Sequence, residues 1–280
     1  MVVQHNLRAM NSNRMLGLTN ATQSKSTEKL SSGYKINRAA DDAAGLSISE
    51  KMRRQIRGLS QASLNAQEGI SMVQAAEGAL TEVHDMLQRM SELSVKAETG
   101  TLTDTDREYI NQEVQQLITE IDRVAVNTTF NEKKLLDGTT GQISIQVDAE
   151  ASKYISFTIG SMRTNAGGLA LDGQKTIATA DPAKTAVQNA AALNTAVKTA
   201  ITTVSNQRSL LGAVQNRLEH TVNNLDNVVE NTTAAESQIR DTDMAAEMVK
   251  YSNNNILAQA GQAMLAQSNQ ANQGVLALIQ

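Results

Sequence analysis

The sequence has no cysteine and no tryptophan, and it has only one proline, two phenylalanines and four tyrosines in 280 residues. Without cysteine the chain has no disulfide bond, no thiol nucleophile and no cysteine-ligated zinc. With so few aromatic side chains, a compact globular core would lack the large residues that usually fill it. Packing must therefore come from Ala, Leu, Val, Ile and Met, which is typical of long helices packed along their length or of surfaces completed in an assembly.

Long apolar runs are also missing. No stretch of 18 apolar residues occurs, so the sequence predicts no membrane-spanning helix. The first residues, MVVQHNLRAMNSNRML, contain no uninterrupted apolar segment of the kind found in cleaved secretory signals. Secretion of this chain would therefore use a route without such a signal.

The charge is mildly acidic, at −4, and it is unevenly distributed. Residues 1–60 carry ten Lys or Arg against four Asp or Glu, whereas residues 217–250 carry three basic against seven acidic residues. The basic segment lacks interleaved aromatics apart from Tyr34, which argues against nucleic-acid binding. We expect a basic N-terminal arm to lie beside an acidic C-terminal arm of the same or a neighbouring chain.

Apolar residues recur at alternating steps of three and four in three segments. The first segment runs from Val73 to Ala97, the second from Ile110 to Val124, and the third from Leu193 to Ile239. Sustained spacing of this kind predicts helices packed against one another in a coiled-coil-like manner. The expected fold is therefore mainly α, an elongated coiled-coil-like helical bundle.

Local signals predict where these helices begin and what separates them. The stretch TDRE, which starts at Thr105, predicts a capping box for the second segment. Asp181 followed by Pro182 predicts the start of the third. Residues 44–99 are expected to form one helix, and the alternating segments QISIQV and YISFTI predict a small β-hairpin in the middle of the chain.

The stretch INRAADDAAGLSIS contains the most tempting catalytic or metal-binding candidates, Asp41 and Asp42. Adjacent helical residues point about 100° apart, so the two carboxylates cannot face each other as an acid–base pair. We interpret the stretch as a charged joint between the N-terminal arm and the long helix, with Arg38 as the counter-charge and Gly45 as the residue that relaxes the backbone.

No other pattern predicts an enzyme, a metal site or a cofactor site. The two DTD triplets, at 104–106 and 241–243, lack the glycine and distal glutamate of a calcium loop. The three histidines are dispersed without ligand spacing, and no phosphate-binding or nucleophile motif is present.

Both ends of the chain carry narrow apolar stripes, too narrow to make an isolated helix stable. We expect these terminal helices to pair with each other and with neighbouring subunits, through an assembly stripe made of Leu7, Met10, Met248, Ile256, Met264, Val275 and Leu278.

Two long segments resemble one family. LSSGYKINRAADDAAGLSISEKMRRQIRGL is similar to the N-terminal signature of bacterial flagellins, and the stretch from NRLEHTVNNLDNVVENTT to the end is similar to their C-terminal signature. The resemblance implies an inner-core domain of residues 1–43 with 240–280. It also implies a helical rod of residues 44–140 with 182–239, and a β-hairpin insert at 141–181. No large outer domain fits in this insert.

The resemblance implies a structural subunit that polymerises into the extracellular filament used for motility. Export would use the flagellar type III apparatus. The partners implied are further copies of the chain, an export chaperone at the C-terminal helix, and hook-associated and cap proteins, with no nucleic acid and no membrane. A hook–filament junction protein and a coiled-coil adaptor are the alternatives.

The segment LQRMSELSVK is similar to the flagellin motif that a Toll-like receptor recognises. By this resemblance, the receptor-binding positions, shared with subunit packing, are Gln88, Arg89, Glu92, Leu93 and, on the facing helix, Glu113.

Overall fold

The computed structural model describes residues 6–165, 167–171 and 186–277, with side chains up to residue 270. Five helices and two small antiparallel sheets make up the described residues, which confirms the mainly α fold with a hairpin in the middle. Two compact units are present, Met1–Ile56 with Glu230–Gln280, and Arg57–Val229. The predicted helix start at Asp181 lies outside the described residues.

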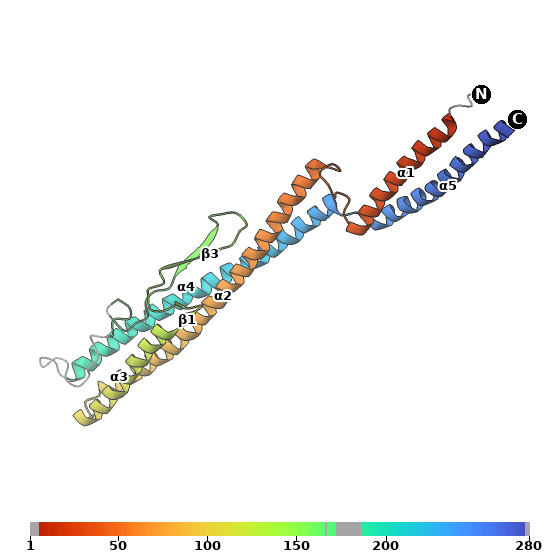
Figure 1. The fold of residues 1–280 in the computed structure, drawn as a ribbon. Helices are drawn as coiled ribbons and strands as arrows, with labels where there is room; N and C mark the ends of the chain where they lie inside the picture. Colours follow the sequence, from red (N-terminus) through yellow and green to blue (C-terminus); the bar gives the residue numbers. More distant parts are fainter. Residues whose placement is uncertain (1–5, 166, 172–185, 278–280) are drawn as a thin grey trace. The chain divides into compact units, whose positions relative to one another are not determined.

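In the first unit, helices α1 (Leu7–Ser32) and α5 (Met244–Ala277) lie side by side (Figure 1). The Asn6 side chain caps α1 by accepting a hydrogen bond from the Ala9 N–H at 3.0 Å. Gly33, with φ of 77°, ends α1 in the left-handed conformation that glycine adopts without strain. The pairing of terminal helices predicted from the sequence is therefore present within one chain.

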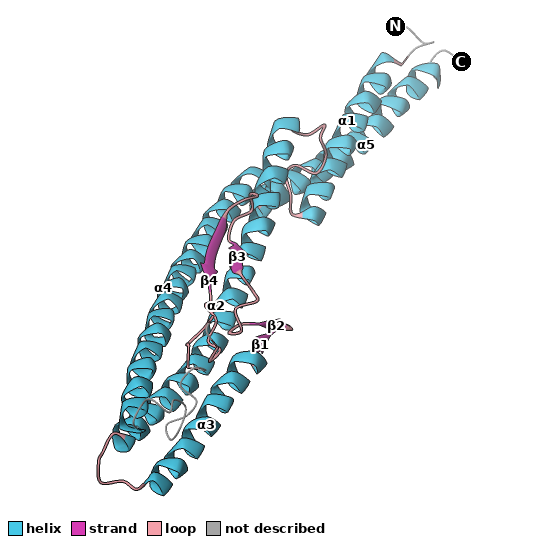
Figure 2. Cartoon of the chain, turned by 90° about the vertical axis from the view of Figure 1, so that its left-hand side faces the viewer, coloured by secondary structure: helices cyan, strands magenta, loops and turns pink. Residues whose placement is uncertain are grey.

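Helices α2 (Ala43–Ala97), α3 (Asp104–Asn127) and α4 (Ala186–Arg240) are drawn in cyan in Figure 2. They supply most of the hydrophobic core of the second unit. The prediction of one helix over residues 44–99 is confirmed. All the residues that form the spacing pattern of the first segment are inaccessible to solvent: Val73, Ala76, Leu80, Val83, Leu87, Met90, Ser94 and Ala97. The third segment is buried from Leu193 to Leu218.

The second apolar segment is shifted relative to the prediction. Leu117 and Val124 are half-buried, whereas Ile118 and Ala125 are buried instead. An α-helix has 3.6 residues per turn, so a strict alternation of threes and fours drifts around its surface. The predicted pattern was therefore correct in period but wrong at these two positions.

The predicted capping box was placed two residues too late. Thr103, not Thr105, is the N-cap of α3, and its hydroxyl accepts from the Asp106 N–H while the Asp106 carboxylate accepts from the Thr103 N–H. The triplet DTD at 104–106 supplies this partner at N3, which is the position that a capping box requires.

The small sheets sit against the helices of the second unit. Strand β1 (Thr129–Phe130) pairs with β2 (Lys133–Lys134), and β3 (Gln142–Gln146) pairs with β4 (Tyr154–Thr158). A Cβ added at Gly69 of α2 would lie 2.2 Å from Cδ1 of Ile145. Glycine at this position therefore lets the β3–β4 hairpin pack closely on the helix. None of the described helices is long and apolar enough to cross a membrane.

Candidate interaction surfaces

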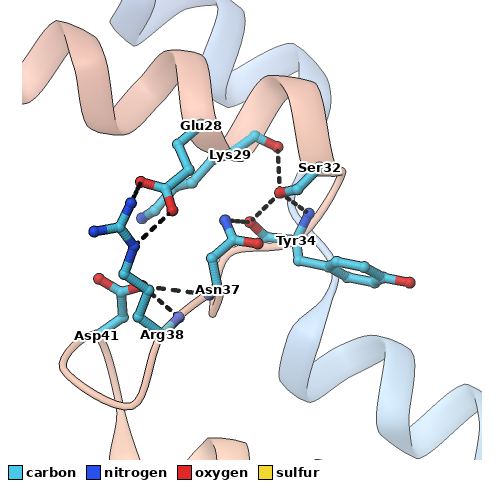
Figure 3. A network of polar contacts seen from close by, with 7 residues as sticks. All are labelled: Glu28, Lys29, Ser32, Tyr34, Asn37, Arg38 and Asp41. Carbon is cyan, nitrogen blue, oxygen red and sulfur yellow. Dashed lines mark hydrogen bonds and ion pairs between the residues drawn. The ribbon is translucent and has the colours of Figure 1, made fainter.

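The segment between α1 and α2 is organised around Asp41 (Figure 3). Its carboxylate accepts hydrogen bonds from the backbone N–H groups of Arg38, at 3.1 Å, and Asn37, at 3.3 Å. These two bonds lower the pKa of the Asp41 carboxyl group. The Arg38 guanidinium pairs with Glu28 at 3.0 Å, so it is not the counter-charge of the two aspartates that the sequence suggested. A backbone turn stabilises Asp41 instead.

Asp42 has a different role from its neighbour. Its carboxylate accepts from the Gly45 N–H at 2.9 Å and so caps the first turn of α2. A Cβ at Gly45 would lie 2.5 Å from the Asp42 carboxylate and 2.8 Å from Cδ1 of Ile36. Gly45 therefore lies in close contact with these two side chains in the first turn of α2, and a role for it in relaxing the backbone stays a prediction.

The segment between α4 and α5 pairs with the one between α1 and α2. The Thr242 N–H donates to the Gly33 carbonyl at 2.9 Å, and the Lys35 N–H donates to the Arg240 carbonyl at 2.8 Å. Asp243 caps α5 by accepting from the Ala246 N–H, as Asp42 caps α2. Because these residues are far apart in the sequence, no local motif predicted their contact.

Tyr34 is the centre of this contact, although in the sequence it stands out only as an isolated aromatic residue in a basic segment. Two guanidinium groups lie over its ring, at 4.7 Å from the centroid for Arg240 and 5.2 Å for Arg53. Arg53 also donates to the Tyr34 hydroxyl and pairs with the buried Glu236, both at 3.0 Å. We call Tyr34, Arg53, Glu236 and Arg240 the tyrosine clasp. This contact between a basic and an acidic segment accords with the charge distribution.

In the second unit, α2 and α3 form a charged hollow of about 370 Å³. Arg89 of α2 pairs with Glu113 of α3 at 2.9 Å and with Glu92 of its own helix at 3.1 Å. The hydrogen bond to Glu113 raises the pKa of Arg89 most, and the hydrogen bond to Glu92 raises it further. Ion pairs thus join three of the five residues inferred from the receptor motif.

The other two residues of the motif occupy different environments. Leu93 lines the hollow but is only 3% exposed, because it packs into the hydrophobic core. Gln88 is exposed, and its amide lies 2.8 Å from the imidazole Nε2 of His84. The motif therefore contains one core position and four polar surface positions.

Five of the predicted stripe residues point to solvent from α1 and α5. Leu7, Met10, Met248, Ile256 and Met264 are between 54% and 67% exposed. The residues that are fully buried between the two helices are small or polar, and the half-buried Leu16 of α1 packs beside them. Ser26, Glu247 and Ala258 are buried, and a Cβ at Gly261 would lie 3.2 Å from Leu16. Val275 lies in α5 beyond the described side chains, and Leu278 lies outside the described residues.

Within the described ranges, no group of three or more His, Asp or Glu side chains could hold a metal ion. The first DTD triplet serves the α3 cap, and Asp243 of the second caps α5. Exposed apolar helical faces, a polar clasp and a charged hollow define a structural protein that makes contacts with other proteins.

Comparison with known proteins agrees with this class. The family model described as the bacterial flagellin N-terminal helical region matches residues 3–140, and the bacterial flagellin C-terminal helical region matches residues 194–279. Flagellin of Halalkalibacterium halodurans is 50% identical over 279 residues, covering 100% of both chains. Flagellin of Bacillus subtilis is 50% identical over 304 residues, also covering 100% of both.

Among solved structures, a Vibrio parahaemolyticus chain assigned as a flagellar hook-associated protein has a TM-score of 0.61 at 14% identity. It covers 72% of this chain and 100% of its own length, and at this identity it shows a shared fold alone.

The chain belongs to the bacterial flagellin family. It is a structural subunit that polymerises into the extracellular flagellar filament and serves motility. This family is a family of structural proteins.

Proposed function

We propose that the exposed faces of α1 and α5 form the surface that neighbouring subunits bury in the filament. The observation that carries this proposal is the outward position of five large apolar side chains on α1 and α5, namely Leu7, Met10, Met248, Ile256 and Met264, which the contact between the two helices leaves uncovered. Fully burying one large apolar side chain contributes about 1.5–3 kcal/mol. Several such side chains per subunit can offset the loss of conformational freedom on assembly.

Electron microscopy after salting-out tests this assembly surface. We expect long filaments from the full chain and none from a chain lacking residues 1–35 and 250–280. A full-length variant with Leu7→Ser and Ile256→Ser should also fail to polymerise. The matched control, Leu7→Ile with Ile256→Leu, keeps both positions apolar and should form filaments. Filaments from the double serine variant would contradict the proposal.

The same micrographs separate the filament subunit from the two alternatives. A junction protein would give short stubs even with added seeds, and an adaptor would give no polymer. The 50% identity to flagellins along the whole chain favours the filament subunit.

For export, we propose the flagellar type III apparatus, with a cytoplasmic chaperone that binds residues 245–280. The outward apolar side chains of α5, such as Met248 and Ile256, would need a cover before assembly. At the filament ends the same faces would remain open for the hook-associated and cap proteins. Secretion that persists in cells without a working type III apparatus would contradict the export route.

We further propose that the charged hollow is the receptor-facing surface. Arg89, Glu92 and Glu113 would contact the flagellin-sensing Toll-like receptor together with Gln88, while the buried Leu93 would set the shape of the hollow from below. Charged side chains held by one another present a fixed pattern to a partner. Because the hollow is also proposed to pack against other subunits, monomer and not filament should signal.

A receptor reporter assay with purified monomer tests the hollow. Arg89→Ala should lower potency by about tenfold or more, as expected for a charged residue at an interface centre. Arg123→Ala is the matched control, because Arg123 pairs with Glu120 at the surface of α3 away from the hollow. Equal loss in the two variants would contradict a specific role for the hollow.

A further inference from the structure

The methionines of this chain are sorted by exposure. Of eleven methionines in the sequence, five lie on α1 and α5 with 46% to 64% of their surface exposed. These exposed residues, which we call the terminal methionines, are Met10, Met15, Met244, Met248 and Met264.

Three methionines of the second unit are buried. Met72, Met90 and Met162 are no more than 8% exposed and belong to its hydrophobic core. Met52 of the first unit and Met86 of the second are half-buried, so the contrast is between the five terminal methionines and these three core methionines.

The chain also contains no cysteine, so methionine is its readily oxidised sulfur. Exposure governs how fast a thioether meets an oxidant, and oxidation converts an apolar, flexible side chain into a polar one. The terminal methionines combine solvent exposure with a place among the apolar side chains Leu7, Leu18 and Ile256 on the same two helices.

We infer that the terminal methionines are a modification site, at which oxidation to the sulfoxide by a peroxide prevents the free subunit from polymerising. This inference rests on the proposed role of α1 and α5 as the assembly surface. The subunit is vulnerable before assembly, and the filament is protected because neighbouring subunits cover the same side chains.

The chemical step is a two-electron oxygen transfer. The sulfur lone pair attacks one oxygen of hydrogen peroxide, the S–O bond forms and the O–O bond breaks. The sulfur is oxidised, the peroxide is reduced, and the departing hydroxide takes the remaining proton to become water. The product sulfoxide is a strong hydrogen-bond acceptor, so burying it against an apolar neighbour leaves it without a donor.

Leucine supplies a matched replacement. Leu and Met have similar volume and similar helix propensity, so Met→Leu keeps the apolar face and removes the reactive sulfur. A chain with all five terminal methionines changed to leucine should polymerise with or without peroxide. A second variant changes only Met244, Met248 and Met264 to leucine. It leaves α1 unaltered and is used if the variant with five substitutions does not fold.

The experiment treats full-length monomer and preformed filaments with hydrogen peroxide and measures oxidation at each methionine by peptide mass spectrometry. Seeded polymerisation is then followed by light scattering. In the monomer, we expect the terminal methionines to oxidise while Met72, Met90 and Met162 stay reduced. The critical concentration should rise by about tenfold or more, the effect of one buried polar group left without a hydrogen bond. Methionine sulfoxide reductases A and B should restore polymerisation, and filaments should resist oxidation.

Either of two results would overturn the inference: oxidation that does not distinguish terminal from core methionines, or normal polymerisation of a chain oxidised at the terminal ones. The assembly role of α1 and α5 is judged separately by Leu7→Ser with Ile256→Ser, in which every methionine stays reduced. Failure of one proposal is therefore distinguishable from failure of the other.

Discussion

The two compact units use long helices for different purposes. The Arg57–Val229 unit buries a continuous apolar core of residues such as Leu80, Leu87 and Leu211. In the Met1–Ile56 and Glu230–Gln280 unit, the buried hydrophobic residues among those described are Ile36 and Ala258, beside buried polar groups such as Glu247. Many of its large apolar side chains, such as Leu7, Met10 and Ile256, face outward instead. We conclude that the buried core of the Arg57–Val229 unit stabilises the monomer. The outward apolar side chains of the other unit keep apolar surface available for assembly.

The largest effect should come from the core of the second unit. Leu87 is inaccessible to solvent, so Leu87→Ala removes buried methyl groups and leaves a cavity. We expect the free energy of unfolding, measured by urea denaturation, to fall by about 2–5 kcal/mol. A loss of free energy of unfolding no larger than that of a surface substitution, about 0.5 kcal/mol, would contradict the comparison. The stability of the second unit would then not depend on its core.

A smaller and pH-dependent effect is expected where α1 meets α5. The Ser26 hydroxyl and then Lys250 lower the pKa of the buried Glu247 carboxyl group from its ordinary value of 4.5. A lowered folded-state pKa contributes stability that is present above the unfolded pKa and is lost as the pH falls through the folded one. Glu247→Gln should therefore cost about 1–2 kcal/mol near neutral pH and almost nothing in acid.

Circular dichroism during urea denaturation, at neutral and acidic pH, measures this difference. Glu120→Gln is the control, because Glu120 pairs with Arg123 at an exposed site and should change stability little. A Glu247→Gln difference that does not shrink in acid would show that the carboxylate charge is not what stabilises the contact.

The end of a helix in the second unit should contribute less than its core. Thr103→Ala removes the capping box of α3 and should cost about 1 kcal/mol. Thr105→Ala, two residues later and exposed, should be nearly neutral. Thermal denaturation of the two variants checks the assignment, and a larger loss at Thr105 would restore the cap position expected from the sequence.

The smallest effect on monomer stability is expected at the terminal faces. Leu7→Ala is the matched counterpart of Leu87→Ala, but Leu7 is exposed, so the free energy of unfolding should change by less than about 0.5 kcal/mol. Polymerisation, followed by light scattering, should nevertheless weaken. A variant that loses monomer stability and polymerises normally would reverse the roles assigned to the two units.

The sequence predicted best where one helix face is buried along its whole length. The apolar residues that recur at steps of three and four between Val73 and Ala97 are buried as their spacing requires, because a continuous core selects a single helix face. Prediction was weaker at Leu117, because the buried face drifts around an α-helix and Ile118 is buried in its place. It was also weaker at Thr105, because Thr103 lies two residues away and serves as the N-cap instead.

Contacts between distant segments could not be predicted from local patterns. In the tyrosine clasp, Tyr34 contacts Arg240, which is about 200 residues away in the sequence. Neither residue belongs to a periodic pattern or a sequence motif. For the charged hollow, resemblance identified Arg89 and Glu113, but the burial of Leu93 appears only when α2 and α3 are packed. For the terminal stripe, periodicity identified the apolar residues but not the outward direction in which they point.

Hydrogen–deuterium exchange mass spectrometry of the full chain, before and after polymerisation, tests the central claim most directly. We predict that peptides from residues 73–97 and 193–218 are protected in both states, because their core is complete in the monomer. Peptides from α1 and α5 should exchange quickly in the monomer and become protected in the filament. Equal protection of α1 and α5 before and after polymerisation would contradict the claim that these helices complete their packing in the assembly.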